Sequence, residues 1–435
     1  MIDVVEKSAI VIGGGVAGIQ ASLDLANRGV KTYLVEKSPS IGGRMAQLDK
    51  TFPTMDCSIC ILAPKMIECL RHPNIELLTY SEVKEVHGSA GDFTVKVLKK
   101  PRYVQADKCV GCGTCADHCP VELPNEFDSG MGIRKAIYLP FPQAVPRVYT
   151  VDRDHCLDCG LCKSVCNAQA VDLEQQAVEI ELHVGGIVVA TGFDIYEPFR
   201  ITSYGYGRYK NVITSMQLER LLCASGPTGG RIMRPSDGRI PRTVAFLQCV
   251  GSRDQRFGYP YCSSICCKYA VKDAVLIKEH RPDSEVYIFY IDLRVFGKGF
   301  QEFANRAKKE FGVKFIRSSP GEIREDPDTK DLTLWYEDTL TRTVKSQKVD
   351  LVVLSVALMP RSDSVELAKI LGIMTDRFGF LTPSDAVGQP VDTQVPGIVG
   401  CGYCLGPRTG DIPDSVMQAG AAAARLSEIL MERSA

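Results

Sequence analysis

The chain has 435 residues, of which 18 are cysteine, six are histidine and one is tryptophan. Its 51 lysines and arginines balance 52 aspartates and glutamates, so charge favours neither nucleic acid as a partner nor an acidic disordered chain. A hydrophobic content of 45% and a charged content of 24% are ordinary for a globular protein. The length predicts roughly two to four domains.

The abundant cysteines are compatible with a disulfide scaffold, a zinc protein or an iron–sulfur protein. Disulfide scaffolds are mostly short secreted chains. Residues 1–7 contain neither the basic region nor the apolar stretch of a signal peptide. No apolar run approaches the ~20 residues of a membrane-spanning helix. We therefore expect a cytoplasmic protein that does not span a membrane and whose clustered cysteines bind metal.

The first residues predict a Rossmann-type unit: a strand over 7–12, a glycine turn over 13–18, a helix over 19–27 and a strand over 32–36. Residues 37–105 predict loops and short strands, including one at 93–98. Residues 106–175 hold eight cysteines and many prolines, with no long helical pattern. Strand-like sequence resumes at 177–181 and 185–192, and a short helix is expected at 215–223.

A second α/β unit begins at residue 241. Its expected strands cover 243–247, 286–291 and 351–356, and its expected helices cover 262–279 and 299–311. The tail contains a strand-like segment at 396–400 and a helix of small residues at 415–431. No tandem repeat is present, apart from a cysteine pattern that occurs twice.

The glycine turn carries a dinucleotide-binding pattern. Gly13, Gly15 and Gly18 lie between a strand and a helix, where glycines allow a tight turn and close approach of the backbone to a pyrophosphate. The N-terminus of the helix then stabilises the phosphate charge. Glu36 ends the second strand, where an acidic residue accepts hydrogen bonds from ribose hydroxyls. The alternative is a turn with only a packing role.

Three segments favour FAD as the dinucleotide. Residues 41–44 resemble the second glycine-rich loop of glutathione-reductase-like and thioredoxin-reductase-like flavoproteins. Residues 190–192 resemble the end of the strand that closes their FAD domain. Residues 396–400 resemble their late flavin-binding segment. That family has an aspartate soon after the late strand, whereas here the nearest acid is Asp411. The expected FAD-binding residues are Gly13, Gly15, Val16, Ala17, Gly18, Glu36, Lys37, Gly42, Gly43, Arg44, Ala190, Thr191, Gly192 and Gly400.

The doubled cysteine pattern is that of a bacterial ferredoxin with two clusters. In such a pair of runs, three cysteines of one run and the fourth cysteine of the other bind each cluster. One [4Fe–4S] cluster is therefore expected at Cys109, Cys112, Cys115 and Cys166, and the second at Cys156, Cys159, Cys162 and Cys119. A zinc site would instead favour paired CxxC motifs or histidine ligands. The second run ends in Asn167 where the pattern usually has proline.

The second α/β unit lacks the glycine pattern of a nicotinamide site. After its first strand stand four cysteines instead: Cys249, Cys262, Cys266 and Cys267. With Cys262 and Cys266 expected on one helix face, the four are expected to surround a third [4Fe–4S] cluster. The alternative is that they are buried apolar side chains, as free cysteines often are. The missing glycines argue against hydride transfer from a nicotinamide.

The expected fold is therefore α/β, with two Rossmann-like, thioredoxin-reductase-like units and an inserted α+β bacterial-ferredoxin domain. The expected domains are a FAD-binding domain over 1–104, 176–240 and 361–435, a ferredoxin domain over 105–175, and a degenerate nucleotide-binding-like domain over 241–360.

These features together resemble the heterodisulfide reductase A-subunit family. The resemblance also covers residues 56–66 and 412–416, and so spans almost the whole chain. It implies an oxidoreductase, namely the FAD and iron–sulfur component of an anaerobic complex that bifurcates or confurcates electrons. It implies the third cluster near the flavin, and a lysine close to flavin N5, which we assign to Lys272. The alternative for Lys272 is a solvated helix lysine.

The resemblance implies as partners the other subunits of such a complex, a ferredoxin or hydrogenase-like electron donor or acceptor, and a second copy of the chain. Two cluster domains of many family members, one N-terminal and one C-terminal, have no counterpart here. One competing function is an NAD(P)H-dependent flavin and iron–sulfur reductase resembling the small subunit of glutamate synthase. Another is an electron relay that does not bifurcate.

Six cysteines remain outside these sets. Cys57 and Cys60 form a CxxC pair that predicts either a redox-active disulfide or ligands of a further cluster. Cys401 and Cys404 form a second such pair with the same two interpretations. Cys69 and Cys223 are expected to be plain core residues.

Overall fold

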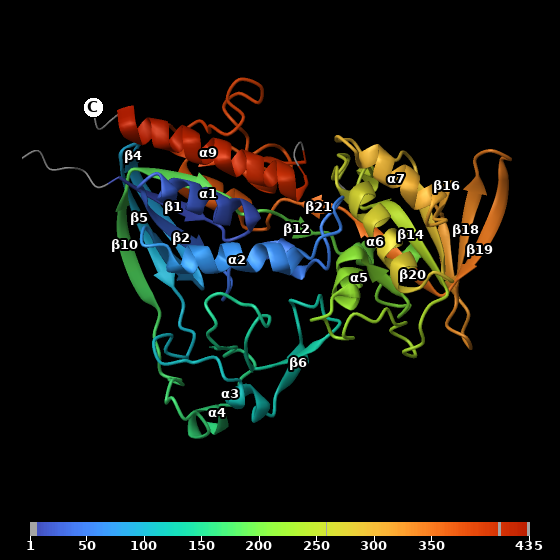
Figure 1. Cartoon of the computed structure of the whole chain (residues 1–435), viewed down its shortest axis with the longest axis horizontal. Helices are drawn as coiled ribbons and strands as arrows, with labels where there is room; N and C mark the ends of the chain where they lie inside the picture. The colour runs from blue at the N-terminus through green and yellow to red at the C-terminus, as the bar shows by residue number, and fades with distance from the viewer. Residues whose placement is uncertain (1–6, 258, 408–409, 433–435) are drawn as a thin grey trace, which may run out of the picture.

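The computed structural model describes residues 7–257, 259–407 and 410–432. Figure 1 shows three parts: a first α/β domain around β1 and α1, a second around β14 and α6, and a small cysteine-rich module below, around α3 and α4. Among the described residues, no helix is both long enough and apolar enough to cross a membrane.

The first domain is built on a five-stranded parallel sheet in the order β22-β11-β1-β2-β3. The strands are β1 (Ser8–Ile12), β2 (Lys31–Glu36), β3 (Ile75–Thr79), β11 (Gly186–Val189) and β22 (Ile398–Gly400). All five residues of β1 are buried, because both faces of this sheet are covered.

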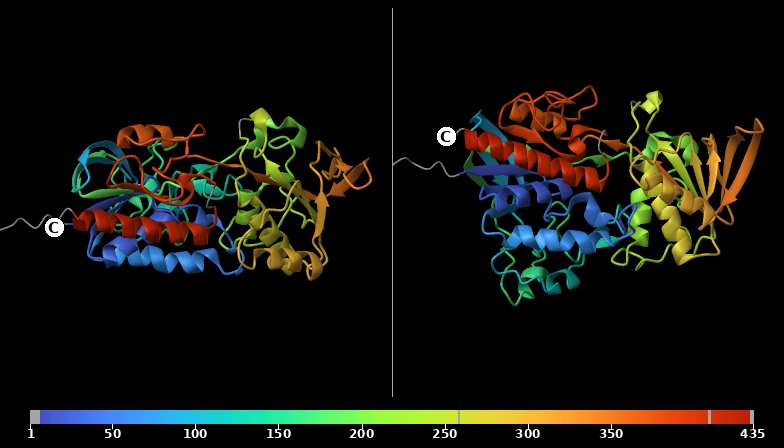
Figure 2. Two further views of the ribbon diagram at one scale, coloured as in Figure 1. Left: turned by 90° about the horizontal axis from the view of Figure 1, so that it is seen from above. Right: turned by 45° about the horizontal axis from the view of Figure 1, so that its top comes forward.

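The two faces of β1 divide this domain into three layers. Ala9 and Val11 pack with the helices α1 (Val16–Asn27), α2 (Ser58–Arg71) and α9 (Ile412–Glu432). Ile10 and Ile12 pack against a three-stranded antiparallel sheet in the order β10-β5-β4. The strands of that sheet are β4 (Ser81–Ser89), β5 (Asp92–Lys99) and β10 (Val178–Val184). Figure 2 shows α9, α1 and α2 side by side on one face.

The second domain repeats this plan with a parallel sheet in the order β13-β20-β14-β15-β16. Its strands are β13 (Val212–Thr214), β14 (Thr243–Val250), β15 (Glu285–Tyr290), β16 (Lys314–Arg317) and β20 (Leu351–Val356). The helices α5 (Ser215–Leu222), α6 (Cys266–His280) and α7 (Phe300–Lys309) pack on one face. An antiparallel sheet of β17 (Glu322–Glu325), β18 (Leu332–Asp338) and β19 (Thr343–Val349) contributes core residues on the other.

Short elements connect these parts. A two-stranded ribbon of β12 (Asp194–Ile195) and β21 (Leu358–Met359) runs between the two domains, and α8 (Ser364–Leu371) packs near β4. The 3-10 helices are η1 (Gly43–Gln47), η2 (Pro198–Arg200), η3 (Thr202–Tyr204), η4 (Gln255–Phe257) and η5 (Gly402–Leu405).

The cysteine-rich module contains two one-turn helices, α3 (Thr114–Asp117) and α4 (Leu161–Ser164), and two small hairpins. The hairpins pair β6 (Glu122–Pro124) with β7 (Ile133–Lys135), and β8 (Ile137–Tyr138) with β9 (Thr150–Val151). An antiparallel bridge between Val104 and Val171 joins the two ends of the module, close to the boundaries expected at 105 and 175.

The structure corrects three sequence expectations. The segment expected to hold only loops and short strands contains α2, whose 14 residues include Pro64. The antiparallel strands β17–β19 were not foreseen. The helix expected from Cys262 begins only at Cys266, because Ser264 adopts a left-handed backbone conformation with φ 66°. Cys262 and Cys266 therefore do not share a helix face.

Candidate functional site

A cavity of about 660 Å³ lies where the three parts of the chain meet. Residues of the glycine turn, of the cysteine-rich module and of α5 and α6 all line it, so that all three parts contribute to its wall. The predicted FAD-binding residues that line it are Gly13, Gly15, Val16, Ala17, Glu36, Lys37, Gly43, Arg44, Ala190, Thr191 and Gly192.

The other predicted FAD-binding glycines are Gly18, Gly42 and Gly400, which do not line the cavity themselves. A side chain at Gly18 would collide with the carbonyl oxygen of Gly13, so only glycine lets α1 pack so closely on the turn. The amide of Gly42 donates to the Gly14 carbonyl at 2.8 Å. Gly400 ends β22.

The turn itself has the shape that a pyrophosphate requires. Gly13 has φ 107°, which favours glycine. A Cβ at Gly15 would meet nothing within 4 Å, which leaves open space directly at the N-terminus of α1. Glu36 accepts a hydrogen bond from the Gly14 amide through Oε2 at 2.6 Å. The open space and the helix N-terminus fit the phosphates of FAD.

Cationic side chains line another part of the cavity. Burial lowers the pKa of Arg44, whose guanidinium lies 3.9 Å from the Asp194 carboxylate. Arg361 donates to Asp194 at 3.1 Å, and Lys37 forms an ion pair with Asp363 at 2.8 Å. The hydrogen bond to Asp363 raises the pKa of Lys37. These groups supply the positive charge that suits a diphosphate.

Several lining residues are not among the predicted FAD-binding residues. Cys401, Gly402 and Tyr403 follow β22 and face the cavity, with Asp411 beside them. Asp411 accepts a salt bridge from the buried Lys268 at 2.7 Å. Lys268 belongs to α6, so this contact joins the two domains across 143 positions of sequence. Only the fold brings these two residues together.

Lys272 lies on α6 at the cavity wall and is only 1% exposed. The alternative of a solvated helix lysine is therefore wrong. Its ammonium donates to Glu219 and, at 3.0 Å, to the carbonyl of Lys50. Burial acts to lower the pKa of Lys272, but the neighbouring acidic side chains of Asp273 and Glu219 outweigh it, and the pKa is raised. Lys272 is therefore a cation at neutral pH.

Six of the eight ferredoxin-type cysteines belong to or pack against the core of the module, whereas Cys112 and Cys159 are exposed. Burial raises the pKa of the Cys115 thiol to about 12, and the neighbouring Cys109, Cys112 and Cys162 add to the effect. Burial likewise raises the pKa of Cys162, whose neighbours are Cys156, Cys159 and Cys119. These neighbours are the members of the predicted second cluster.

The donor set fits iron–sulfur clusters. Thiolates are the ligands that such clusters require, and the module offers eight free cysteines. The amide of Ala170 donates to Cys166 Sγ at 3.3 Å, a contact that stabilises a cluster thiolate.

The four cysteines of the second domain also converge, although they come from a strand, a loop and a helix. Cys266 neighbours Cys267, Cys249 and Cys262, and burial raises its pKa. Cys249 stands at a bulge in β14 with φ 63°. Burial raises the pKa of Cys267 to about 11, so without a metal Cys267 remains a thiol.

Aromatic rings separate this set from the cavity. Tyr403 and Tyr269 both line the cavity. Tyr403 neighbours Cys266 and Cys262, and Tyr269 neighbours Cys266. A group bound by these cysteines would therefore be one aromatic side chain away from a ligand in the cavity.

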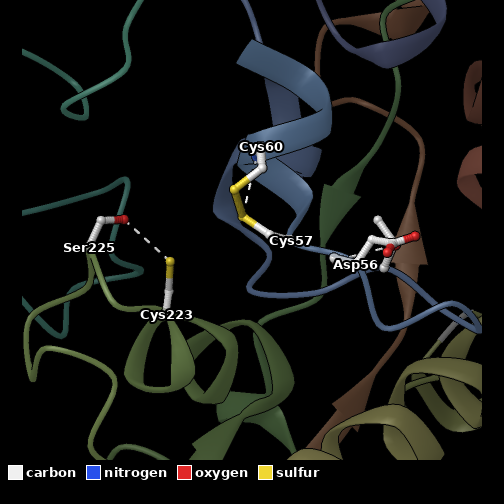
Figure 3. Close-up of a disulfide and its surroundings, with 6 residues drawn as sticks. Asp56, Cys57, Cys60, Cys223 and Ser225 are labelled. Carbon is white, nitrogen blue, oxygen red and sulfur yellow. Dashed lines mark hydrogen bonds between the residues drawn. A yellow bond between two sulfur atoms is a disulfide. The ribbon is translucent and has the colours of Figure 1, made fainter. Parts of the chain in front are cut away.

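Cys57 and Cys60 are joined in a disulfide at the N-terminus of α2 (Figure 3). Cys57 is the N-cap of α2, and its sulfur accepts from the Cys60 amide at 3.3 Å. Cys223, which is hydrogen-bonded to Ser225 at 3.3 Å, is among the residues around it. Cys60 is exposed.

The remaining cysteines are free and buried. Cys69 is fully buried and Cys223 is 6% exposed, so both are core residues as expected. Cys401 and Cys404 are not joined in a disulfide, and burial raises the pKa of Cys404 to about 11. A buried thiol of this kind is a poor nucleophile.

Two family models match the chain. The model of FAD dependent oxidoreductases matches residues 9–57, and that of 4Fe-4S dicluster domains matches residues 108–171. These matches confirm FAD and [4Fe–4S] clusters as the cofactors, and the ferredoxin domain as part of the fold. The cluster at Cys249, Cys262, Cys266 and Cys267 stays a prediction.

Curated relatives match nearly the whole chain. The A-subunit of the H(2):CoB-CoM heterodisulfide,ferredoxin reductase of Methanothermobacter thermautotrophicus is 54% identical over 97% of this chain and 63% of its own length. The iron-sulfur A-subunit of the CoB–CoM heterodisulfide reductase of Methanocaldococcus jannaschii is 55% identical over 97% of this chain and 64% of its own length. The chain thus spans just under two thirds of these relatives.

Solved structures confirm the fold class. Thioredoxin reductase of Lactococcus lactis matches 98% of this chain and 99% of its own, with a TM-score of 0.55 and 17% identity. The thioredoxin reductase of T. acidophilum matches 97% and 99%, with a TM-score of 0.54 and 14% identity. At such identities the likeness concerns the fold alone.

Proposed function

Since the chain belongs, over nearly its whole length, to the heterodisulfide reductase A-subunit family, we propose that it is the FAD and iron–sulfur electron-transfer core of a heterodisulfide-reductase-like complex. Electrons pass between its ferredoxin-type clusters and partner subunits, by flavin-based bifurcation or confurcation. FAD exchanges electrons in pairs or singly, whereas an iron–sulfur cluster moves one at a time.

The observation that carries this proposal is the composition of the cavity wall. The cavity that suits FAD is lined on one side by the ferredoxin module, through residues 125–127. On another side stand Tyr269 and Tyr403, which adjoin the four cysteines of the second domain. A flavin in this cavity would have an electron carrier on each side, which is what a branching point needs.

In this proposal each residue set has a definite role. The predicted glycines and Glu36 hold FAD, the three cysteine sets hold clusters, and the Lys272 cation faces the flavin and stabilises negative charge on it. The Cys57–Cys60 disulfide is a second redox group, which takes up two electrons and two protons when it is reduced to two thiols.

The proposed partners are the other subunits of such a complex, a ferredoxin or hydrogenase-like donor or acceptor, and a second copy of the chain. The relatives' names support ferredoxin in this role, since the Methanothermobacter protein is named for heterodisulfide and ferredoxin. We also propose a cytoplasmic location, where the cluster cysteines would stay reduced until they bind iron.

The test is anaerobic reduction of the purified protein. We expect reduced ferredoxin to bleach the flavin rapidly, and NADH or NADPH to leave it oxidised. Bleaching by a nicotinamide would instead favour a reductase resembling the small subunit of glutamate synthase. Adding an acceptor tests branching: a relay would reoxidise fully with a single acceptor, whereas a bifurcating site would need a high- and a low-potential acceptor together.

A further inference from the structure

A cluster of ionisable side chains lies buried at the cavity wall. Lys272, Asp273 and Glu219 are 1%, 0% and 2% exposed. Glu219 on α5 and Lys272 on α6 line the cavity, whereas Asp273 is not part of its lining. Asp273 therefore stands in a second layer, where it can act on a cavity ligand only through Lys272.

The two carboxyl groups receive different hydrogen bonds. Glu219 accepts from the Lys272 ammonium through Oε1 and from the Asp49 amide through Oε2 at 3.0 Å. Asp273 Oδ1 lies 3.0 Å from the Lys272 nitrogen. Among the described residues, however, neither oxygen of Asp273 accepts a hydrogen bond of good geometry. The arrangement therefore stabilises an ionised Glu219 better than an ionised Asp273.

The charges in this cluster do not cancel if both carboxyl groups are ionised. Two carboxylates and one ammonium would leave an excess negative charge in a fully buried place, which is unfavourable because the charge is removed from water without a counter-charge. One bound proton makes the cluster neutral. Burial and the neighbouring carboxylate of Glu219 raise the pKa of Asp273 well above its usual range, against the opposing effect of Lys272.

Other titratable groups face the cluster from the elements packed around it. Asp49 and Lys50 approach from the segment before α2, and Tyr269 from the preceding turn of α6. Burial and the charge of Glu219 raise the pKa of Asp49 as well. Burial also raises the pKa of Tyr269, so it is neutral. Lys50 contacts the cluster through its backbone carbonyl, and its ammonium pairs with Glu279 at 3.7 Å. Asp49 and Tyr269 carry no positive charge that could ionise Asp273.

We propose that Asp273 is a positioning residue that carries a proton at neutral pH, so that Lys272 is balanced by Glu219 alone and presents a cation to the cavity without excess negative charge behind it. This inference rests on the proposed function, in which Lys272 acts on the flavin. An ionised Asp273 would oppose negative charge on the flavin, and would lower its reduction potential.

The test compares Asp273→Asn with the double variant Asp273→Asn, Glu219→Gln in the FAD- and cluster-loaded protein, by measuring the flavin midpoint potential with redox dyes from pH 6 upward. Asparagine replaces a protonated aspartate by a neutral side chain of the same shape. We therefore expect no shift at pH 7 in Asp273→Asn, and a raised potential in the double variant, in which no carboxylate balances Lys272. At high pH the wild-type potential should fall below that of Asp273→Asn, as Asp273 loses its proton.

A raised potential in Asp273→Asn at pH 7 would show that Asp273 is ionised and would overturn the proposal. So would loss of FAD or of folding in Asp273→Asn, because a neutral side chain should replace a neutral one without such damage. FAD and iron contents of every variant are measured alongside. Failure of the proposed function itself would be distinguishable, since wild-type protein would then lack FAD or be reduced by NADH.

Discussion

A buried ion pair joins the ferredoxin module to the second domain. Removing this pair should destabilise the contact between them. Asp128, in the loop of the β6–β7 hairpin, accepts from Arg220 Nε at 2.9 Å. The Arg220 side chain is 1% exposed, and it also donates to the Gln47 carbonyl at 2.9 Å. The guanidinium lies 4.7 Å from the centre of the Phe127 ring. Figure 1 shows β6 reaching from the module toward α5.

We expect Asp128→Ala to release this hairpin from α5. Removing one partner of a buried pair leaves the other charge uncompensated, at a cost of about 3–5 kcal/mol. At roughly 1.4 kcal/mol per factor of ten, the hairpin should open roughly a hundred to several thousand times more often. Amide hydrogen exchange of residues 122–135 under native conditions measures this opening directly.

Glu126→Ala in the same loop is the matched control. The Glu126 side chain is 69% exposed, and its partner Arg134 keeps a second ion pair with Asp152 at 2.8 Å, so removing Glu126 leaves no buried charge uncompensated. Iron content should equal that of wild type in both variants, since neither residue belongs to a cysteine set. If exchange in Asp128→Ala were no faster than in Glu126→Ala, the reasoning that this pair holds the module in place would be refuted.

Three further predictions concern the cofactors and the disulfide. Cys249→Ser should lose about four irons per chain and keep the ferredoxin-type clusters and FAD, by iron and flavin analysis; unchanged iron would refute the third cluster. Gly15→Ala, which has open space for its methyl group, should fold normally but bind less FAD. Gly18→Ala, which collides with backbone, should lower the thermal midpoint; equal behaviour of the two variants would contradict this difference. Mild reduction should raise the number of titratable thiols in the wild-type protein by about two. It should not raise that number in a Cys57→Ser, Cys60→Ser double variant. An equal rise in both proteins would locate the disulfide elsewhere.

Local patterns made much of this fold predictable. The glycine turn, the paired ferredoxin runs and the regular strands depend on neighbours close in sequence, so spacing alone identifies them. The helix α2 was missed because Pro64 stands within it and its residues 60–71 include both exposed and buried apolar side chains. Helix prediction from periodicity treats such a segment as irregular.

Contacts between distant segments were beyond the reach of sequence patterns. The pairs Lys268–Asp411 and Arg220–Asp128 join residues that are 143 and 92 positions apart. Their charges look like ordinary surface charges in the sequence, and only the packing of the domains buries them. The cluster of Lys272, Glu219 and Asp273 has the same origin, because α5 and α6 meet only in the folded protein.

The loop after β14 differs from the turn of a nicotinamide site. A dinucleotide site needs a tight glycine turn that leads directly from a strand into a helix, so that the helix N-terminus meets the pyrophosphate. Here β14 ends at Val250 and α6 begins only at Cys266. The described part of this long loop folds back on itself, because the backbone amide of Arg253 donates to the Tyr261 carbonyl at 2.9 Å.

The same loop brings its two ends together and so creates the cysteine set. Cys249 precedes the loop, Cys262 lies near its end, and Cys266 and Cys267 follow it, yet all four are neighbours. Gly251 packs against the Tyr196 ring so closely that a side chain there would collide with it. The helix N-terminus that would bind phosphate in a nicotinamide-dependent reductase here presents two thiols. This exchange of ligands favours a domain that receives single electrons over one that receives hydride.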